Sequence, residues 1–299
     1  MTTRKWIREM PLHVMLIPTV VLLIAFSYVP MTGIAIAFQN FYPGHNFFSS
    51  PWVGWENFQY MLQLPGTLQV LYNTLFIAVL KIVANLVVPI VMALLLNEVR
   101  KMWFKRSVQT IVYLPYFISW VLLGGILVDI LSPSQGIVNE ILKAVGLPSV
   151  YFLGDNHWFP FTLVATNTWK EFGFNTIVFL AALTGINPSL YEAACIDGAS
   201  RWKQTLKITL PGLLPIIILL ATLSLGNVLN AGFDQVFNLY NASVYESGDI
   251  IDTMVYRIGM GDGQYSVATA VGLFKSVVSF ILISVSYLLA YRFANYRIF

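Results

Sequence analysis

Long apolar stretches alternate with polar segments along the chain. Six stretches hold roughly 20 or more mostly apolar residues, the length that a helix needs to cross a hydrocarbon core about 30 Å thick. They lie at 12–37, 70–96, 108–131, 161–183, 213–233 and 267–291. The apolar residues are continuous and do not alternate, so the pattern predicts helices and not the strands of a membrane barrel. We therefore predict an all-α integral membrane protein with six transmembrane helices.

Basic residues in the connecting segments predict the orientation. Of the 17 Lys and Arg residues, twelve lie in segments that face inside if the N-terminus is cytoplasmic, whereas Lys143 and Arg257 lie outside. Cytoplasmic loops are enriched in Lys and Arg, so we expect both termini to be cytoplasmic. The first stretch is too long for a signal peptide and lacks a cleavage site, so we expect a retained span. The twelve residues are Arg4, Lys5, Arg8, Arg100, Lys101, Lys105, Arg106, Arg201, Lys203, Lys207, Arg292 and Arg297.

The composition agrees with a membrane protein and excludes several other classes. The chain has 299 residues, of which 57% are hydrophobic and 10% charged, whereas soluble domains are about 25% charged. This balance excludes a soluble enzyme, a disordered chain and a nucleic-acid-binding module. The single cysteine, Cys195, and three dispersed histidines match no metal-ligand spacing. The sequence also lacks a phosphate-binding G-x-x-x-x-G-K-[ST] loop, so we expect neither bound ATP nor a metal.

The segment between the fourth and fifth stretches, residues 186–211, has the most specific pattern. Asn-Pro-Ser at 187–189 is a helix-start signal. Glu192 falls near the positive end of that helix, and Gly198 permits a sharp bend. A second short, basic helix is expected to end at Leu210-Pro211. Such a compact pair of helices suits a cytoplasmic partner, with a simple structured connector as the alternative.

The string LYEAACIDGASRWKQTLKITLPGLLP in this segment resembles the signature loop of binding-protein-dependent ABC importer permeases, in their carbohydrate branch. WVGWENF, LLNEVRKMWFKRSVQTIVYLPYFISW and GFDQVFNLYN further resemble permeases of complex-oligosaccharide importers. The similarity covers nearly the whole chain. It implies a type I ABC importer permease fold in the bacterial cytoplasmic membrane.

The resemblance also implies roles for residues and partners. Residues 186–211 would form a coupling helix in a groove of an ATPase subunit, with Glu192 meeting backbone or basic groups and Gly198 making the turn. The other implied coupling residues are Ala193, Ala194, Ala199, Leu206, Ile208, Leu210 and Pro211. The implied partners are a second, non-identical permease, an external solute-binding protein and two ABC ATPase domains. ATP and Mg would bind those ATPase subunits, and this chain would bind no cofactor.

Polar residues within the spans are candidates for a substrate pathway, because ionisable groups in a membrane normally face protein or water. Sugars stack on aromatic rings and bond to amides and carboxylates, whereas structural contacts between helices are the alternative role. Lys81 with Asn85, and Lys275 with Ser279, form pairs four residues apart, for which helix–helix roles are favoured. In the fourth stretch, Asn167, Glu171 and Asn175 recur every four residues and share one helix face. In the fifth, Ser224, Asn227, Asn230, Asp234 and Asn238 form a polar stripe at 3–4-residue spacing. The pathway candidates are Asn167, Trp169, Lys170, Glu171, Phe174, Asn175, Asn227, Asn230, Asp234 and Lys275.

Together, these features predict the permease subunit of an ATP-driven oligosaccharide importer. We expect residues 1–69 to form the first span and an external loop, and residues 70–299 to form a five-helix core. An ion-coupled sugar carrier is the alternative, with Lys170, Glu171 and Asp234 as relay groups. A membrane enzyme is disfavoured, because no nucleophile has a plausible base partner.

Overall fold

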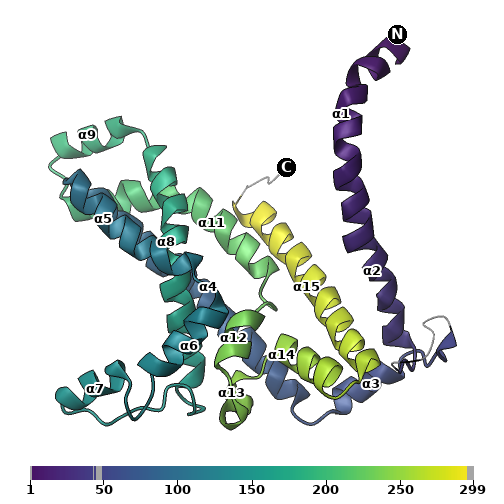
Figure 1. Cartoon of the computed structure of the whole chain (residues 1–299). Coiled ribbons are helices and arrows are strands. Elements are labelled where there is room, and N and C mark those ends of the chain that lie inside the picture. The colour runs from purple at the N-terminus through teal and green to yellow at the C-terminus, as the bar shows by residue number, and fades with distance from the viewer. Residues whose placement is uncertain (1, 43, 45–48, 295–299) are drawn as a thin grey trace. The chain divides into compact units, whose positions relative to one another are not determined.

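A computed structural model describes residues 2–42, 44 and 49–294 of the chain, with side chains described within 9–288 (Figure 1). Helices dominate these residues, and the β-bridge among them joins Gln39 and Trp52. The predicted all-α class is therefore confirmed. Arg297 lies outside the described residues, and Arg4, Lys5, Arg8 and Arg292 lie outside those whose side chains are described.

The chain divides into two compact units, which we describe separately. The first unit is Met1–Leu64 with Val255–Leu273, and the second is Pro65–Met254 with Phe274–Phe299. The first unit holds α1 (Thr2–Leu23), η1 (Ile24–Tyr28), α2 (Val29–Met31), η2 (Thr32–Phe38), α3 (Glu56–Gln63), η7 (Arg257–Gly261) and the start of α15 (Tyr265–Ala294).

The first unit begins with a long apolar helical run. No residue in the most apolar window of Glu9–Phe38 is buried. Large exposed apolar side chains such as Phe26 are unfavourable in water and suit contact with lipid. Further along, the Asn57 amide donates hydrogen bonds to the carbonyls of Ala37 and Gln39, at 2.9 and 3.0 Å. These bonds fix α3 against the end of the run.

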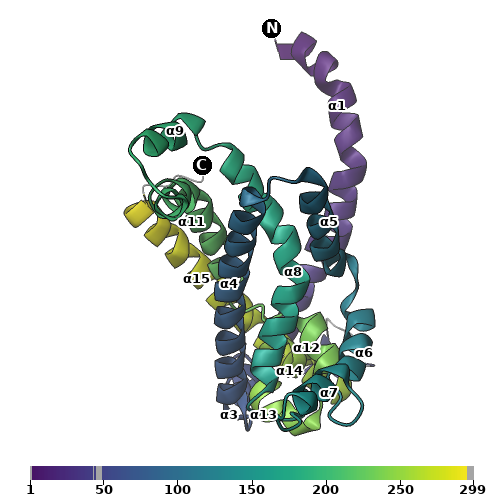
Figure 2. The same cartoon turned by 90° about the vertical axis from the view of Figure 1, so that its left-hand side faces the viewer.

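The second unit is built around α4 (Thr67–Glu98) and α8 (Phe159–Thr184), which lie side by side (Figure 2). Phe179 and Ala93 are fully buried between them together with Leu213 of α11. The remaining elements are α5 (Met102–Tyr113), η4 (Leu114–Phe117), α6 (Trp120–Ile130), α7 (Ile137–Ala144), α9 (Pro188–Ile196), α10 (Arg201–Gln204), η5 (Thr205–Thr209), α11 (Leu210–Gly226), α12 (Phe233–Leu239), η6 (Ala242–Val244), α13 (Tyr245–Gly248) and α14 (Ile251–Tyr256).

Among the described residues, four helices are long and apolar enough to cross a membrane. The count rises to six if each of two bent pairs is one span. One pair, Met102–Phe117 with Trp120–Ile130, bends by 106°. The third predicted span, 108–131, is therefore not a single helix, because the chain turns between η4 and α6. The other pair bends by 70° where α8 meets α9.

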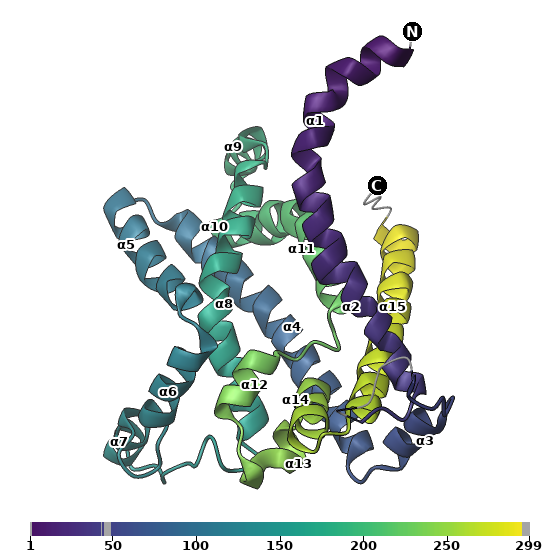
Figure 3. The same cartoon turned by 45° about the vertical axis from the view of Figure 1, so that its right-hand side comes forward.

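The fifth predicted span differs from the structure at both ends. α10, η5 and α11 form one helical run from Arg201, so no separate helix ends at Leu210-Pro211 (Figure 3). Pro211 lies inside this run, just after the π-helical turn η5, where its missing N–H removes one intrahelical hydrogen bond. At the other end α11 stops at Gly226, and residues 227–232 are not helical. Gly232, with φ of 92°, adopts the left-handed conformation that glycine allows before α12.

Candidate functional site

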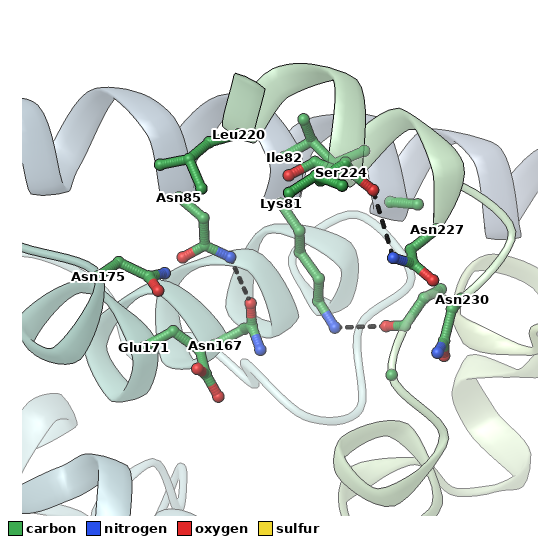
Figure 4. A pocket seen from close by; sticks show the side chains of 14 residues that line it. Lys81, Ile82, Asn85, Asn167, Glu171, Asn175, Leu220, Ser224, Asn227 and Asn230 are labelled. Carbon is green, nitrogen blue, oxygen red and sulfur yellow. Dashed lines mark hydrogen bonds between the residues drawn. The ribbon is translucent and has the colours of Figure 1, made fainter. Parts of the chain in front are cut away.

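The second unit contains a cavity of about 380 Å³ among α4, α8 and the end of α11 (Figure 4). Polar side chains among apolar helices are costly in a membrane unless they bond to one another or face water or a ligand. The polar lining consists of Lys81, Asn85, Asn167, Glu171, Asn175, Ser224, Asn227 and Asn230.

One wall of the cavity is a face of α8. Asn167, Glu171 and Asn175 recur every four residues, so the regular helix presents them on the same side, as predicted. The Asn85 amide of α4 donates to Asn167 Oδ1 at 2.9 Å. Glu171 accepts no hydrogen bond from the described residues, although its charge interacts with those of Lys170 and Lys81. Its carboxylate is therefore available to hydroxyl groups in the cavity.

The opposite wall is the non-helical segment 227–232, which we call the unwound segment. Asn227, Asn230, Ala231 and Gly232 of this segment line the cavity. Where a helix unwinds, main-chain groups lose their helical partners and need others. The predicted regular stripe from Ser224 to Asn238 is therefore wrong in form, although its first half does face the cavity.

Lys81 of α4 reaches the unwound segment. Its ammonium donates to the carbonyl oxygen of Ala231 at 2.6 Å and to Gln235 Oε1. Sequence reasoning favoured a helix–helix role for Lys81 but missed Gln235 altogether. The two lysine contacts join residues about 150 positions apart, and no local pattern signals such a pairing.

The other five pathway candidates do not line this cavity, and their role in transport stays a prediction. The Lys170 ammonium donates to the Tyr116 carbonyl at 2.7 Å. Phe174 stacks on the Tyr116 ring, with centroids 4.2 Å apart. Lys275 forms an ion pair with Asp252 of α14. The five candidates are Trp169, Lys170, Phe174, Asp234 and Lys275.

Residues 186–211, which we call the elbow, contain a tightly specified turn. The Asn187 side chain accepts a hydrogen bond from the Ser189 N–H, so it caps α9 as predicted. At the end of α9, the N–H groups of Gly198 and Ala199 donate to the carbonyls of Cys195 and Ala194, at 3.1 and 2.8 Å. This is the Schellman pattern, which needs a left-handed residue, and Gly198 has φ of 72°. The predicted turn at Gly198 is confirmed.

Side-chain contacts hold the two arms of the elbow together. Gln204, only 6% exposed, donates to the Ala199 carbonyl at 2.9 Å and to Cys195 Sγ at 3.3 Å. The Tyr191 hydroxyl lies 3.0 Å from Thr209 Oγ1. These partly buried contacts make the elbow a defined local structure.

The outer face of the elbow carries exposed apolar side chains. Ile196 is 87% exposed and Trp202 is 70% exposed. Glu192 is also exposed, whereas Ala199, Ile208 and Leu210 are partly buried and Leu206 is exposed. Sequence reasoning missed Ile196 and Trp202, although each is a large apolar residue beside the turn. The remaining assignments of residues to ATPase coupling stay predictions, because only a complex with the ATPase subunit would test them.

Residues 85–296 match the family described as binding-protein-dependent transport system inner membrane component. The chain belongs to this family. The permease resemblance seen in the sequence is confirmed, and the subunit is a transport component. The ion-coupled carrier and the membrane enzyme are set aside.

Two similar proteins come from Bacillus subtilis (strain 168). The polygalacturonan/rhamnogalacturonan transport system permease protein YteP is 40% identical over 99% of this chain and 92% of the relative. Protein LplB is also 40% identical, over 98% of this chain and 92% of the relative. The similarity therefore extends over nearly the whole of both relatives.

Solved structures extend the comparison to the fold. A chain of a bacterial ABC transporter involved in the import of the acidic polysaccharide alginate matches with a TM-score of 0.89 and 39% identity. The match covers 97% of this chain and 98% of that chain. A second structure, of the bacterial alginate ABC transporter with an alginate pentasaccharide-bound periplasmic protein, gives the same TM-score at 38% identity and covers 97% of each chain. The chain therefore has the fold of an ABC importer permease.

Proposed function

We propose that this chain is one of two permease subunits of an ATP-driven importer of oligosaccharides derived from polysaccharides. The observation that carries the proposal is the cavity, where five asparagines, one serine, one lysine and one carboxylate meet among apolar helices. Amides both donate and accept hydrogen bonds and carboxylates accept them. This set suits the many hydroxyl groups of a sugar chain.

The relatives support this substrate class. One relative is named as a polygalacturonan/rhamnogalacturonan transport system permease, and a similar solved structure is that of a transporter involved in the import of alginate. A permease for arabinooligosaccharides is 29% identical over 90% of this chain. The common element of these substrates is a chain of sugar units, so we assign the oligosaccharide class and no single sugar.

The partners follow from the same proposal. A second, non-identical permease supplies the other half of the path, and an external solute-binding protein delivers the sugar. Two ATPase domains bind ATP and Mg on the cytoplasmic side, where we place both termini and the elbow. Exposed Ile196, Trp202 and Glu192 contact the ATPase. ATP binding closes the ATPase pair and moves the two elbows together, so that the permeases exchange inward- and outward-open states.

The test is uptake by the assembled importer. The chain is reconstituted in proteoliposomes with the permease, ATPase and binding protein of its own transport system. Labelled oligogalacturonides, alginate oligosaccharides and arabinooligosaccharides are offered in turn. We expect ATP-dependent accumulation of at least one of them, and none when the binding protein is omitted.

A pair of matched variants tests whether the cavity lies on the path of the sugar. Asn175→Leu replaces one amide on the α8 face, whereas Gly125→Ala adds a methyl group where nothing lies within 4 Å. We expect the first to reduce uptake about tenfold, as for loss of a buried hydrogen bond to a ligand, and the second to leave it unchanged. ATP-dependent uptake of amino acids or metal ions, with no uptake of any oligosaccharide, contradicts the proposal.

A further inference from the structure

Two buried lysines in the second unit each contact the main chain at a helix break. Lys81 of α4 is 6% exposed and donates to the Ala231 carbonyl in the unwound segment. Lys170 of α8 is 7% exposed and donates to the Tyr116 carbonyl in η4, next to the 106° bend. The packed helices α4 and α8 thus each donate a lysine hydrogen bond to a neighbouring segment at the point where its helix is interrupted.

A helix break in a membrane protein has an energetic requirement. The interrupted turn leaves carbonyl groups without the N–H that a continuous helix would provide, and unsatisfied groups are costly in hydrocarbon. A lysine carries three donors and can satisfy such carbonyls from another helix. The buried ammonium in turn needs hydrogen-bond acceptors. The lysine and the main-chain carbonyls at the break therefore stabilise each other.

The Lys81 contacts continue into a buried network. Gln235, 1% exposed at the start of α12, accepts from Lys81 and donates to the Leu163 carbonyl and to Thr166 Oγ1, both at 2.8 Å. Thr166 in turn donates to the Thr162 carbonyl of α8 at 2.7 Å. One network therefore joins α4, the unwound segment, α12 and α8.

Gly232 shows how closely the segment approaches the lysine. A Cβ on Gly232 would lie 3.2 Å from Lys81 Nζ, and its φ of 92° is unfavourable for any side chain. The segment held in this way presents Asn227 and Asn230 to the cavity (Figure 4). Lys81 therefore contacts the same segment that carries these two amides.

We propose that Lys81 is a positioning residue that holds the unwound segment as a wall of the cavity and does not itself recognise the sugar. Two of its three donors are used by Ala231 and Gln235. This inference rests on the proposed function only in taking the molecule that enters the cavity to be a sugar. The opposing role is an ion pair between Lys81 and a carboxylate of an acidic oligosaccharide.

The position of the segment is measured by cysteine labelling in the assembled importer, without substrate. Asn230→Cys is made in a Cys195→Ser background, because Cys195 is the only cysteine in the sequence. Adding Lys81→Met is expected to change the rate of maleimide labelling at position 230 about tenfold, as the loss of charged hydrogen bonds would. Lys170→Met, an equally buried lysine at the other break, is the matched control and leaves that rate unchanged.

Asn175→Cys in the same background reports on the α8 wall. Its labelling rate is expected to be unchanged by Lys81→Met, because regular helix holds that position. If Lys81→Met does not accumulate, Gly232→Ala disturbs the same contact without removing the lysine, since its Cβ would lie 3.2 Å from Lys81 Nζ, and the same change at position 230 is expected. Equal labelling at position 230 with and without the Lys81 or Gly232 substitution overturns the proposal.

Uptake separates the positioning role from sugar binding. With Lys81→Met, we expect uptake of acidic and of neutral oligosaccharides to fall by the same factor, since both meet the displaced wall. A loss confined to acidic oligosaccharides overturns the proposal and assigns Lys81 to substrate carboxylates. If the unaltered importer carries no oligosaccharide, the proposed function fails, whereas the labelling rates still decide whether Lys81 holds the segment.

Discussion

Gly198→Ala perturbs the turn of the elbow through the backbone alone. The glycine has φ of 72°, and a Cβ added there would meet no atom within 4 Å. The whole cost is therefore conformational, about 1–2 kcal/mol for a left-handed alanine. If this free energy destabilises the folded elbow, the fraction of molecules in which the elbow is locally open rises about 5–30-fold.

Tryptic cleavage of the solubilised importer measures that population. Arg201 and Lys203 lie in α10, just after the turn, and are exposed. Cleavage of a helical segment requires local opening, so its rate follows the open population when opening is fast. We expect Gly198→Ala to be cleaved about 5–30 times faster at these sites than the unaltered chain.

The same position supplies the control. Asparagine tolerates the left-handed conformation better than alanine, and β-branched valine tolerates it least. Cleavage should therefore rise in the order Gly198→Asn, Gly198→Ala, Gly198→Val, and ATP-driven uptake should fall in that order. Cleavage of Gly198→Val at the rate of the unaltered chain would refute the reasoning.

Three further predictions concern packing, charge and the exposed face. Gly173→Ala brings a Cβ into collision with the Val112 carbonyl oxygen, so α5 must shift and the melting temperature of the solubilised chain should fall. Lys275→Met leaves Asp252 without the cation it pairs with, which should destabilise the second unit by about 1–3 kcal/mol in a denaturation series. Ile196→Asp changes a side chain that is 87% exposed, so it should preserve folding but weaken ATPase pull-down at least about tenfold.

Each has a matched control. Gly125→Ala adds the same methyl group to open space and should not change the melting temperature. The double variant Lys275→Met with Asp252→Leu removes both charges and should recover most of the lost stability. Ile196→Val keeps an apolar side chain and should retain the ATPase. Equal melting temperatures for the two glycine variants, no recovery in the double variant, or equal pull-down by both Ile196 variants would contradict the respective prediction.

Local signals in the sequence identified the parts of the site that depend on neighbouring residues. Four-residue spacing placed Asn167, Glu171 and Asn175 on one face of α8, and a regular helix forms there. Asn187 caps α9 and Gly198 makes the turn, because capping and left-handed geometry are decided within a few residues. Such features do not depend on distant packing.

Long-range contacts could not be predicted in the same way. Apolar counts extended the fifth span through residue 233, although the helix stops at Gly226. The break is stabilised by Lys81, about 150 residues earlier in the chain. Lys275 is a pathway candidate from its place in a span, whereas the structure pairs it with Asp252 of α14, 23 residues earlier in the chain. Tertiary packing decides each of these positions.

ATP dependence of uptake tests the central claim most directly. Proteoliposomes holding this chain, its second permease and the ATPase are loaded with ATP or with a non-hydrolysable analogue, and a protonophore is added in a parallel sample. Oligosaccharide is supplied outside on the binding protein. We predict uptake with ATP, with or without the protonophore, and none with the analogue. Uptake that proceeds with the analogue and is abolished by the protonophore would contradict the account.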